Sequence, residues 1–110
     1  MEKNGTIMIV DDNEDVRNMY KDFLYCFAPD LEVIQARNGR EAADKLEEMA
    51  ITNSLPDAVL TGFDMPVKNG LDLLRLIRLH PNPLMRNLRV VMLSGNCSDQ
   101  LRMNAEELNC

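Results

Sequence analysis

The sequence predicts an α/β fold in which a parallel β-sheet carries helices on both faces. Apolar runs that suit strands alternate four times with segments of helical periodicity. The first run, residues 6–10, is apolar and partly β-branched, with no polar alternation, as expected of a strand buried on both faces. The chain has 110 residues, a length that suits one hydrophobic core, so we expect a single domain over residues 1–110.

The segment after the first strand predicts an amphipathic helix. Apolar residues recur there at helical spacing and indicate one buried stripe. They are Val16, Met19, Tyr20, Phe23, Leu24 and Phe27. Asp12 or Asn13 is expected to cap the start of this helix, and Pro29 to end it.

A second strand and a second helix follow. Residues 31–36 mix apolar and polar side chains, which indicates a strand at the edge of the sheet. Asn38-Gly39 resembles a hairpin turn, but the residues after it have helical spacing. Asn38 with Glu41 three positions later is therefore interpreted as a capping box at the start of a helix.

The remainder of the chain predicts two more strand-and-helix pairs. Residues 58–61 are expected to form the third strand, and residues 71–79 the third helix. The prolines that follow predict a loop, in which His80 is expected to be solvated. Residues 88–93 form the fourth strand. Ser98 is expected to cap a last helix near the end of the chain.

The composition excludes several classes of function. Eighteen acidic residues against twelve basic ones give a net charge of −6, and the chain has no basic block that could neutralise a nucleic acid or an anionic membrane. No apolar run approaches the ~18 residues of a membrane-spanning helix. The three cysteines form no zinc-binding or CxxC pattern and are interpreted as reduced thiols, which predicts a cytoplasmic protein.

Three polar clusters follow predicted strands and are expected to meet at one edge of the sheet. They are Asp11-Asp12, residues 62–64 and Ser94-Gly95. Paired carboxylates repel each other unless a proton or a cation neutralises them. Oxygen ligands favour a hard ion, so Mg²⁺ is expected, with Ca²⁺ or Mn²⁺ as substitutes. The alternative interpretation, that the acidic pair is only a solvated turn with a helix cap, remains open.

These motifs resemble the receiver domain of two-component response regulators. That family has an acidic pair after the first strand, matched by Asp11 and Asp12, and a P-D-x4-D-x2-M-P-x3-G pattern around the third, matched throughout residues 56–70 except at Gly62. A Ser or Thr followed by a small residue after the fourth strand is matched by Ser94-Gly95. The resemblance implies a flavodoxin-like doubly wound sheet of order 2-1-3-4, with a fifth strand in complete members.

The sequence departs from the family pattern in two places. Gly62 stands where the family has the aspartate that accepts a phosphoryl group, and glycine has no nucleophile. The fifth strand and fifth helix, with their lysine and aromatic switch residue, are expected to be missing. Asp64, two positions after the missing acceptor, is expected to reach a metal held by Asp11 and Asp12. Ser94 and Gly95 are expected to bind an anion.

The resemblance and its departures predict a degenerate receiver that signals through protein contacts and is not an enzyme. Its partners are expected to be a sensor kinase or a downstream signalling protein, and not nucleic acid or membrane. Self-association is expected through the fourth-strand edge or the face of the first helix, where Phe23, Tyr25 and Phe27 lie. Two alternatives remain open: a receiver phosphorylated at Asp64 or Asp12, and an ordinary response regulator whose sequence is shortened or altered.

Overall fold

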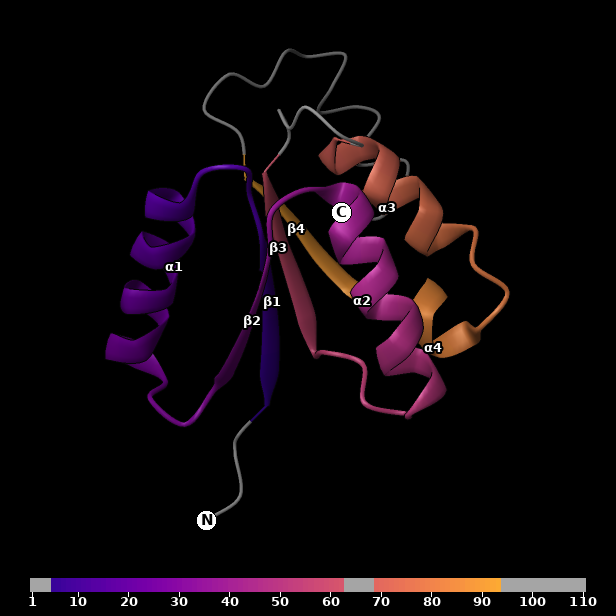
Figure 1. Cartoon of the computed structure of the whole chain (residues 1–110). Coiled ribbons are helices and arrows are strands. Elements are labelled where there is room, and N and C mark those ends of the chain that lie inside the picture. The colour runs from indigo at the N-terminus through magenta and orange to yellow at the C-terminus, as the bar shows by residue number, and fades with distance from the viewer. Residues whose placement is uncertain (1–4, 63–68, 94–110) are drawn as a thin grey trace.

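A parallel sheet with helices on both faces organises the chain, as predicted (Figure 1). The structure, a computed structural model, describes residues 5–62 and 69–93. Within these ranges the four strands are β1 (Thr6–Val10), β2 (Glu32–Ala36), β3 (Ala58–Gly62) and β4 (Arg89–Leu93), in the order β2-β1-β3-β4. This order confirms the predicted topology and the edge position of β2. The predicted last helix lies outside the described residues.

The register of the parallel strands aligns their carboxyl ends. Val10, at the end of β1, pairs with Ala36 of β2 and with Thr61 of β3. Gly62 in turn pairs with Leu93, at the end of β4. The residues that follow these strands therefore start from the same edge of the sheet, which is where open α/β sheets bind their ligands.

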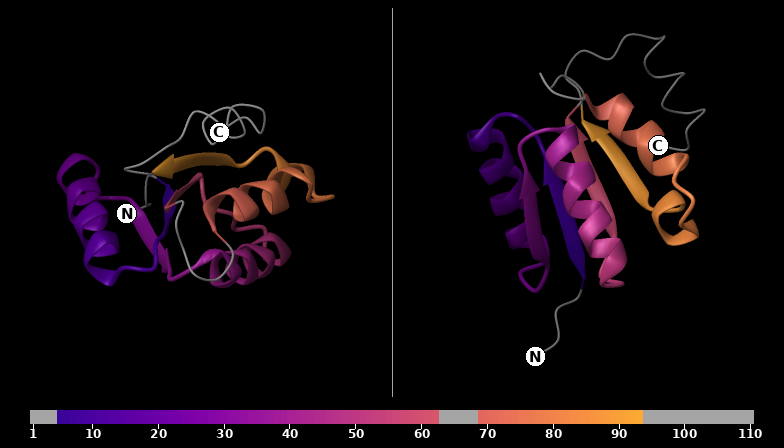
Figure 2. Two further views of the ribbon diagram at one scale, coloured as in Figure 1. Left: turned by 90° about the horizontal axis from the view of Figure 1, so that it is seen from above. Right: turned by 45° about the vertical axis from the view of Figure 1, so that its right-hand side comes forward.

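The main core lies between the sheet and the helices on one of its faces. Helices α2 (Gly39–Ile51) and α3 (Gly70–Arg78) cover this face, while α1 (Glu14–Phe27) lies on the opposite side (Figure 2). Alternating strand residues such as Met8, Val10 and Val59 point into this core with less than 2% of their surface exposed. None of the helices in the described ranges combines the length and the apolar composition that a bilayer crossing requires.

The apolar stripe of α1 is only partly buried, so the predicted buried stripe is wrong in half of its members. Val16, Tyr20 and Leu24, spaced four residues apart, are half-buried. Phe23 and Phe27 are 61% and 75% exposed, and their rings lie 4.9 Å apart. Their exposure agrees with the other expectation, that Phe23, Tyr25 and Phe27 lie on an uncovered face of this helix. The helical period correctly identified an apolar surface on α1. Within the described structure, only the part of that surface that faces the sheet is covered.

Asparagine side chains cap the first two helices. Asn13 Oδ1 accepts hydrogen bonds from two backbone N–H groups in the first turn of α1, at 2.8 and 3.2 Å, which makes Asn13 the cap in place of Asp12. Asn38 Oδ1 accepts from the Glu41 backbone N–H at 2.8 Å, as predicted. The Glu41 carboxylate accepts from the backbone N–H of Arg37 at 3.2 Å, whereas a standard capping box would use the N–H of the cap residue Asn38.

The segment after α3 was predicted as a loop but contains one helical turn, α4 (Pro83–Arg86). Proline is tolerated in the first turn of a helix, and the Asn82 side chain accepts from the Leu84 N–H at 2.9 Å. His80 was predicted to be solvated, which is wrong. Its Nε2 lies 2.6 Å from Glu47 Oε1, and its Nδ1 accepts from the Asn82 N–H at 3.0 Å.

Asp57, a residue of the family motif, has a structural position at the amino end of the sheet. Its carboxylate accepts a hydrogen bond from the Thr6 N–H, and its own N–H donates to the Thr6 carbonyl, both at 2.8 Å. Gly5 has a φ of +135°, and a Cβ there would lie 2.5 Å from Asp57 Oδ2. Asp57 therefore joins the start of β1 to β3, far along the strands from the polar clusters.

Candidate functional site

Asp11 and Gly62 meet at the carboxyl edge of the sheet. They follow the paired residues Val10 and Thr61 directly. A Cβ built on Gly62 would lie 2.7 Å from Asp11 Oδ2 and 3.5 Å from Asp11 Cγ. A side chain at position 62 would therefore be directed at the Asp11 carboxylate, which supports the expectation that these two clusters share one site.

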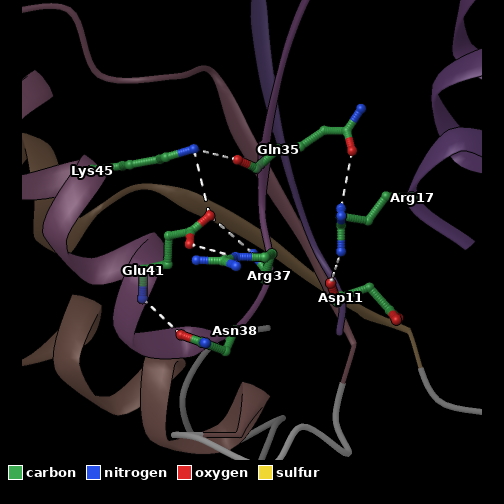
Figure 3. Close-up of polar contacts among 7 residues, drawn as sticks. All are labelled: Asp11, Arg17, Gln35, Arg37, Asn38, Glu41 and Lys45. Carbon is green, nitrogen blue, oxygen red and sulfur yellow. Dashed lines mark hydrogen bonds and ion pairs between the residues drawn. The ribbon is translucent and has the colours of Figure 1, made fainter. Parts of the chain in front are cut away.

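Asp11 is held in place through its backbone and its side chain. Its N–H donates to the Ala36 carbonyl at 3.1 Å, and its Oδ1 accepts from the Asn13 N–H at 2.9 Å. Its carbonyl accepts from Arg17 Nη1 at 2.7 Å (Figure 3). These contacts fix the backbone at the end of β1 and leave Oδ2 directed toward position 62.

Arg17, which the sequence analysis did not identify, connects the site to the neighbouring strand. It lies on α1, is 8% exposed, and donates from Nε to Gln35 Oε1 at 2.9 Å as well as to Asp11 (Figure 3). The Gln35 carbonyl accepts from Lys45 Nζ on α2 at 2.5 Å. Gln35 is thus bonded to residues on both faces of the sheet. A polar residue inside a predicted strand was the sequence signal that could have indicated a buried partner such as Arg17.

Comparison with protein families agrees with the fold and with the position of Asp11 and Gly62. The response regulator receiver domain model matches residues 7–110. The chain belongs to that family. This result agrees with the sheet order and with the acidic residues at the end of β1, and it makes this chain a receiver of two-component signalling.

Most of the named relatives of this receiver are much longer proteins. A protein-glutamate methylesterase/protein-glutamine glutaminase of Geobacillus kaustophilus is 41% identical over 99 residues, which cover 88% of this chain and 25% of that protein. Chemotaxis protein CheY1 of Helicobacter pylori is 35% identical over 72 residues, which cover 66% of this chain and 54% of CheY1. The chain therefore spans about a quarter of the length of the methylesterase relative and about half of CheY1.

Solved receiver structures have the same fold. The phosphorylated cyanobacterial phytochrome response regulator RcpA superposes with a TM-score of 0.83 at 25% identity, over 98% of this chain and 76% of RcpA. A putative response regulator of Chloroflexus aurantiacus has a TM-score of 0.79 at 29% identity, over 98% of this chain and 81% of that one. These values agree with the four-stranded order seen in the described residues of this receiver.

The predicted site residues are only partly within the described structure. Asp11 is half-buried beside Gly62, and Asp12 is exposed next to it. Asp64, Ser94 and Gly95 lie outside the described residues. Within residues 5–62 and 69–93, no three His, Cys, Asp or Glu side chains converge as a metal site. The donors present, the Asp11 and Asp12 carboxylates, are of the type that a hard divalent cation prefers.

The Asp11 carboxyl group ionises less readily than an ordinary aspartate. Burial raises its pKa above the usual 3.8, and the hydrogen bond and charge of Asp12 raise it further. The Asn13 N–H and the charge of Arg17 lower the pKa and only partly offset these effects. A divalent cation beside this pair would favour the ionised form, so the electrostatics fit a cation at this position.

Asp11→Asn is expected to stabilise the folded receiver at neutral pH when a chelator is present. A raised folded-state pKa means that ionised Asp11 destabilises the fold, and that this loss appears as the pH rises from 3.8 through the folded-state pKa. The amide removes the charge but keeps an oxygen that can accept from the Asn13 N–H. Urea unfolding at neutral pH should show a higher midpoint for Asp11→Asn than for the wild type.

The pH dependence of this gain is the control. The difference between Asp11→Asn and the wild type should shrink as the pH falls through the raised folded-state pKa and below 3.8, where Asp11 becomes protonated in both the folded and the unfolded state. The Glu41 carboxyl, whose pKa is lowered from 4.5 chiefly by its hydrogen bond to Arg37, titrates in both proteins and cancels in the difference. A variant less stable than the wild type at neutral pH would contradict this account of Asp11.

Proposed function

We propose that the chain is a cytoplasmic receiver, forming one domain over residues 1–110, that takes no phosphoryl group at position 62 and signals through protein contacts. The observation that carries this proposal is where a side chain at position 62 would point. A Cβ at Gly62 would lie 2.7 Å from Asp11 Oδ2, so the position faces the acidic pair but has no carboxylate to offer. Aspartyl phosphorylation needs a carboxylate nucleophile beside the metal.

A divalent cation fits this proposal without any phosphoryl transfer. Asp11 and Asp12 would hold Mg²⁺, or Ca²⁺ or Mn²⁺ in its place, with Asp64 as a further carboxylate ligand and Ser94-Gly95 available to an anion. The cation would supply positive charge to the acidic pair. The raised pKa of Asp11 supports this assignment, because such a carboxyl gains from a neighbouring cation.

The proposed partners are proteins of a signalling pathway. A sensor kinase or a downstream signalling protein fits a receiver, and self-association is proposed through the β4 edge or the α1 face. Phe23, Tyr25 and Phe27 on α1 are 61%, 68% and 75% exposed, and Val91 on β4 is 40% exposed. Exposed aromatic residues in one region are typical of protein contacts.

Incubation of the wild-type chain with a small phosphodonor and Mg²⁺ tests this function. Intact mass spectrometry is expected to show the unmodified mass, whereas a receiver with an aspartate at the acceptor position, treated in parallel, gains one phosphoryl group. A stable adduct on the wild-type chain would overturn the proposal. Its location at Asp64 or Asp12 would instead support a receiver that uses a substitute acceptor.

A further inference from the structure

We propose that a hollow lined by three arginines, at the opposite end of the molecule from Asp11, binds a phosphate group. The hollow has a volume of about 390 Å³ and lies where α3, α4 and β4 meet. Its lining residues are Arg78, Arg86, Asn87, Leu88 and Arg89. Arg89 is the first residue of β4, so the hollow lies at the amino end of that strand, whereas Gly62 pairs with Leu93 at the carboxyl end.

The charge of the hollow is opposite to that of the whole chain. The chain has a net charge of −6 and only twelve basic residues, yet three guanidinium groups line this one hollow, and none of the described residues that line it has a carboxylate. Guanidinium groups bind phosphate oxygens through paired, charge-assisted hydrogen bonds. The two outer arginines, Arg86 and Arg89, supply two positive charges, which match the up to two negative charges of a phosphate group better than the one charge of a carboxylate.

The hollow is built on a fixed segment of backbone. Arg78, half-buried on α3, donates from Nη1 to the carbonyls of Arg86 and Leu88 at 3.0 and 2.5 Å. Asn87 Nδ2 donates to the Pro83 carbonyl at 2.8 Å. These bonds hold the connection between α4 and β4, and with it the backbone of the two outer arginines, before any ligand arrives. A preorganised site loses less entropy on binding.

The two outer arginines have no acidic partner among the described residues. Arg86 and Arg89 are exposed, and neither side chain makes an ion pair within residues 5–62 and 69–93. In register, Arg89 pairs with Ala58, which follows Asp57 in the sequence. The Asp57 carboxylate is bonded to the Thr6 N–H at 2.8 Å, on the β1 side of β3. Desolvation of both guanidiniums by a bound anion therefore breaks no such pair.

The ligand is defined by its phosphate group, which a small metabolite or a phosphorylated side chain of a partner protein can supply. The ¹⁵N amide spectrum of the full chain, titrated at constant ionic strength, tests binding. The probes are inorganic phosphate, a nucleoside monophosphate and a short phosphoserine peptide. We expect saturable shifts at residues 86–89 with inorganic phosphate. The tighter of the other two probes identifies the source of the phosphate.

The double variant Arg86→Gln/Arg89→Gln is expected to bind at least about tenfold more weakly, while Arg40→Gln, an exposed arginine on α2, binds like the wild type. The single variants Arg86→Gln and Arg89→Gln give the same information if the double variant unfolds. The proposal is overturned if phosphate produces no saturable shift at residues 86–89. It is equally overturned if the arginine variants bind as tightly as the wild type.

Discussion

Gly62→Asp is expected to give a receiver that gains one phosphoryl group from a small phosphodonor in the presence of Mg²⁺. The new carboxylate would extend from a Cβ that lies 2.7 Å from the present position of Asp11 Oδ2, so the Asp11 carboxylate must shift, which perturbs its hydrogen bond to the Asn13 N–H. The variant then has the nucleophile that acyl-phosphate formation requires beside the acidic pair. Intact mass spectrometry measures the gain.

Two matched variants separate charge from steric effects at position 62. Gly62→Ala adds only the Cβ, and Gly62→Asn adds a side chain of the shape of aspartate without its charge or nucleophilicity. Neither should be phosphorylated. In chelator, Gly62→Asp should be less stable than Gly62→Asn, because a third carboxylate joins Asp11 and Asp12, and Mg²⁺ should remove most of this difference. Equal stability of the two variants in chelator would contradict the proximity of position 62 to the acidic pair.

Arg17→Met is expected to lower the free energy of unfolding by about 2 kcal/mol, because a buried hydrogen-bond donor is lost and its acceptors are left unsatisfied. Arg17 is 8% exposed and donates to the Asp11 carbonyl at 2.7 Å and to Gln35 Oε1 at 2.9 Å. Methionine keeps much of the length and apolar volume of the side chain. Urea unfolding measures the change.

The control for this effect is an arginine that makes no such bonds to any residue that the structure describes. Arg40→Met, at an exposed position on α2, should change the free energy of unfolding by less than about 0.5 kcal/mol. A further variant, Arg17→Met/Gln35→Met, removes the Gln35 acceptor along with the donor and should recover part of the loss. An Arg17→Met protein as stable as the wild type would show that these two hydrogen bonds contribute little.

The positions of the strands could be predicted because they depend on patterns that the backbone itself imposes, whereas their order followed from the resemblance to receiver domains. An unbroken apolar run at Thr6–Val10 suits a strand buried on both faces, and the structure has it in the centre of the sheet. Asn13 and Asn38 cap helices through bonds to the next few residues, so local sequence identified Asn38 and narrowed the first cap to Asp12 or Asn13.

Except for the short helix α4, the predictions that were wrong depend on contacts between residues far apart in the sequence. The period of α1 showed an apolar stripe but not which residues the sheet would cover, and Phe27 remained 75% exposed. His80 is bonded to Glu47, 33 residues earlier, and Arg17 to Gln35, 18 residues later. No local pattern encodes such partners.

The candidate site was predictable in its position and partly in its chemistry. Asp11 and Gly62 follow strands that pair in parallel, so their proximity follows from topology. The hydrogen bonds that fix Asp11, and the burial that raises its pKa, depend on how α1 and β2 pack around it. Asp64, Ser94 and Gly95 lie outside the described residues, so their roles remain predictions.

Chemical trapping of acyl phosphates tests the central claim most directly. Borohydride reduces an aspartyl phosphate to homoserine, which leaves a stable mark that peptide mass spectrometry can locate. After treatment with phosphodonor and Mg²⁺, the wild-type chain is predicted to contain no homoserine, while Gly62→Asp contains it at position 62. Homoserine at position 11, 12 or 64 of the wild-type chain would contradict the account of this protein as a receiver without an acceptor.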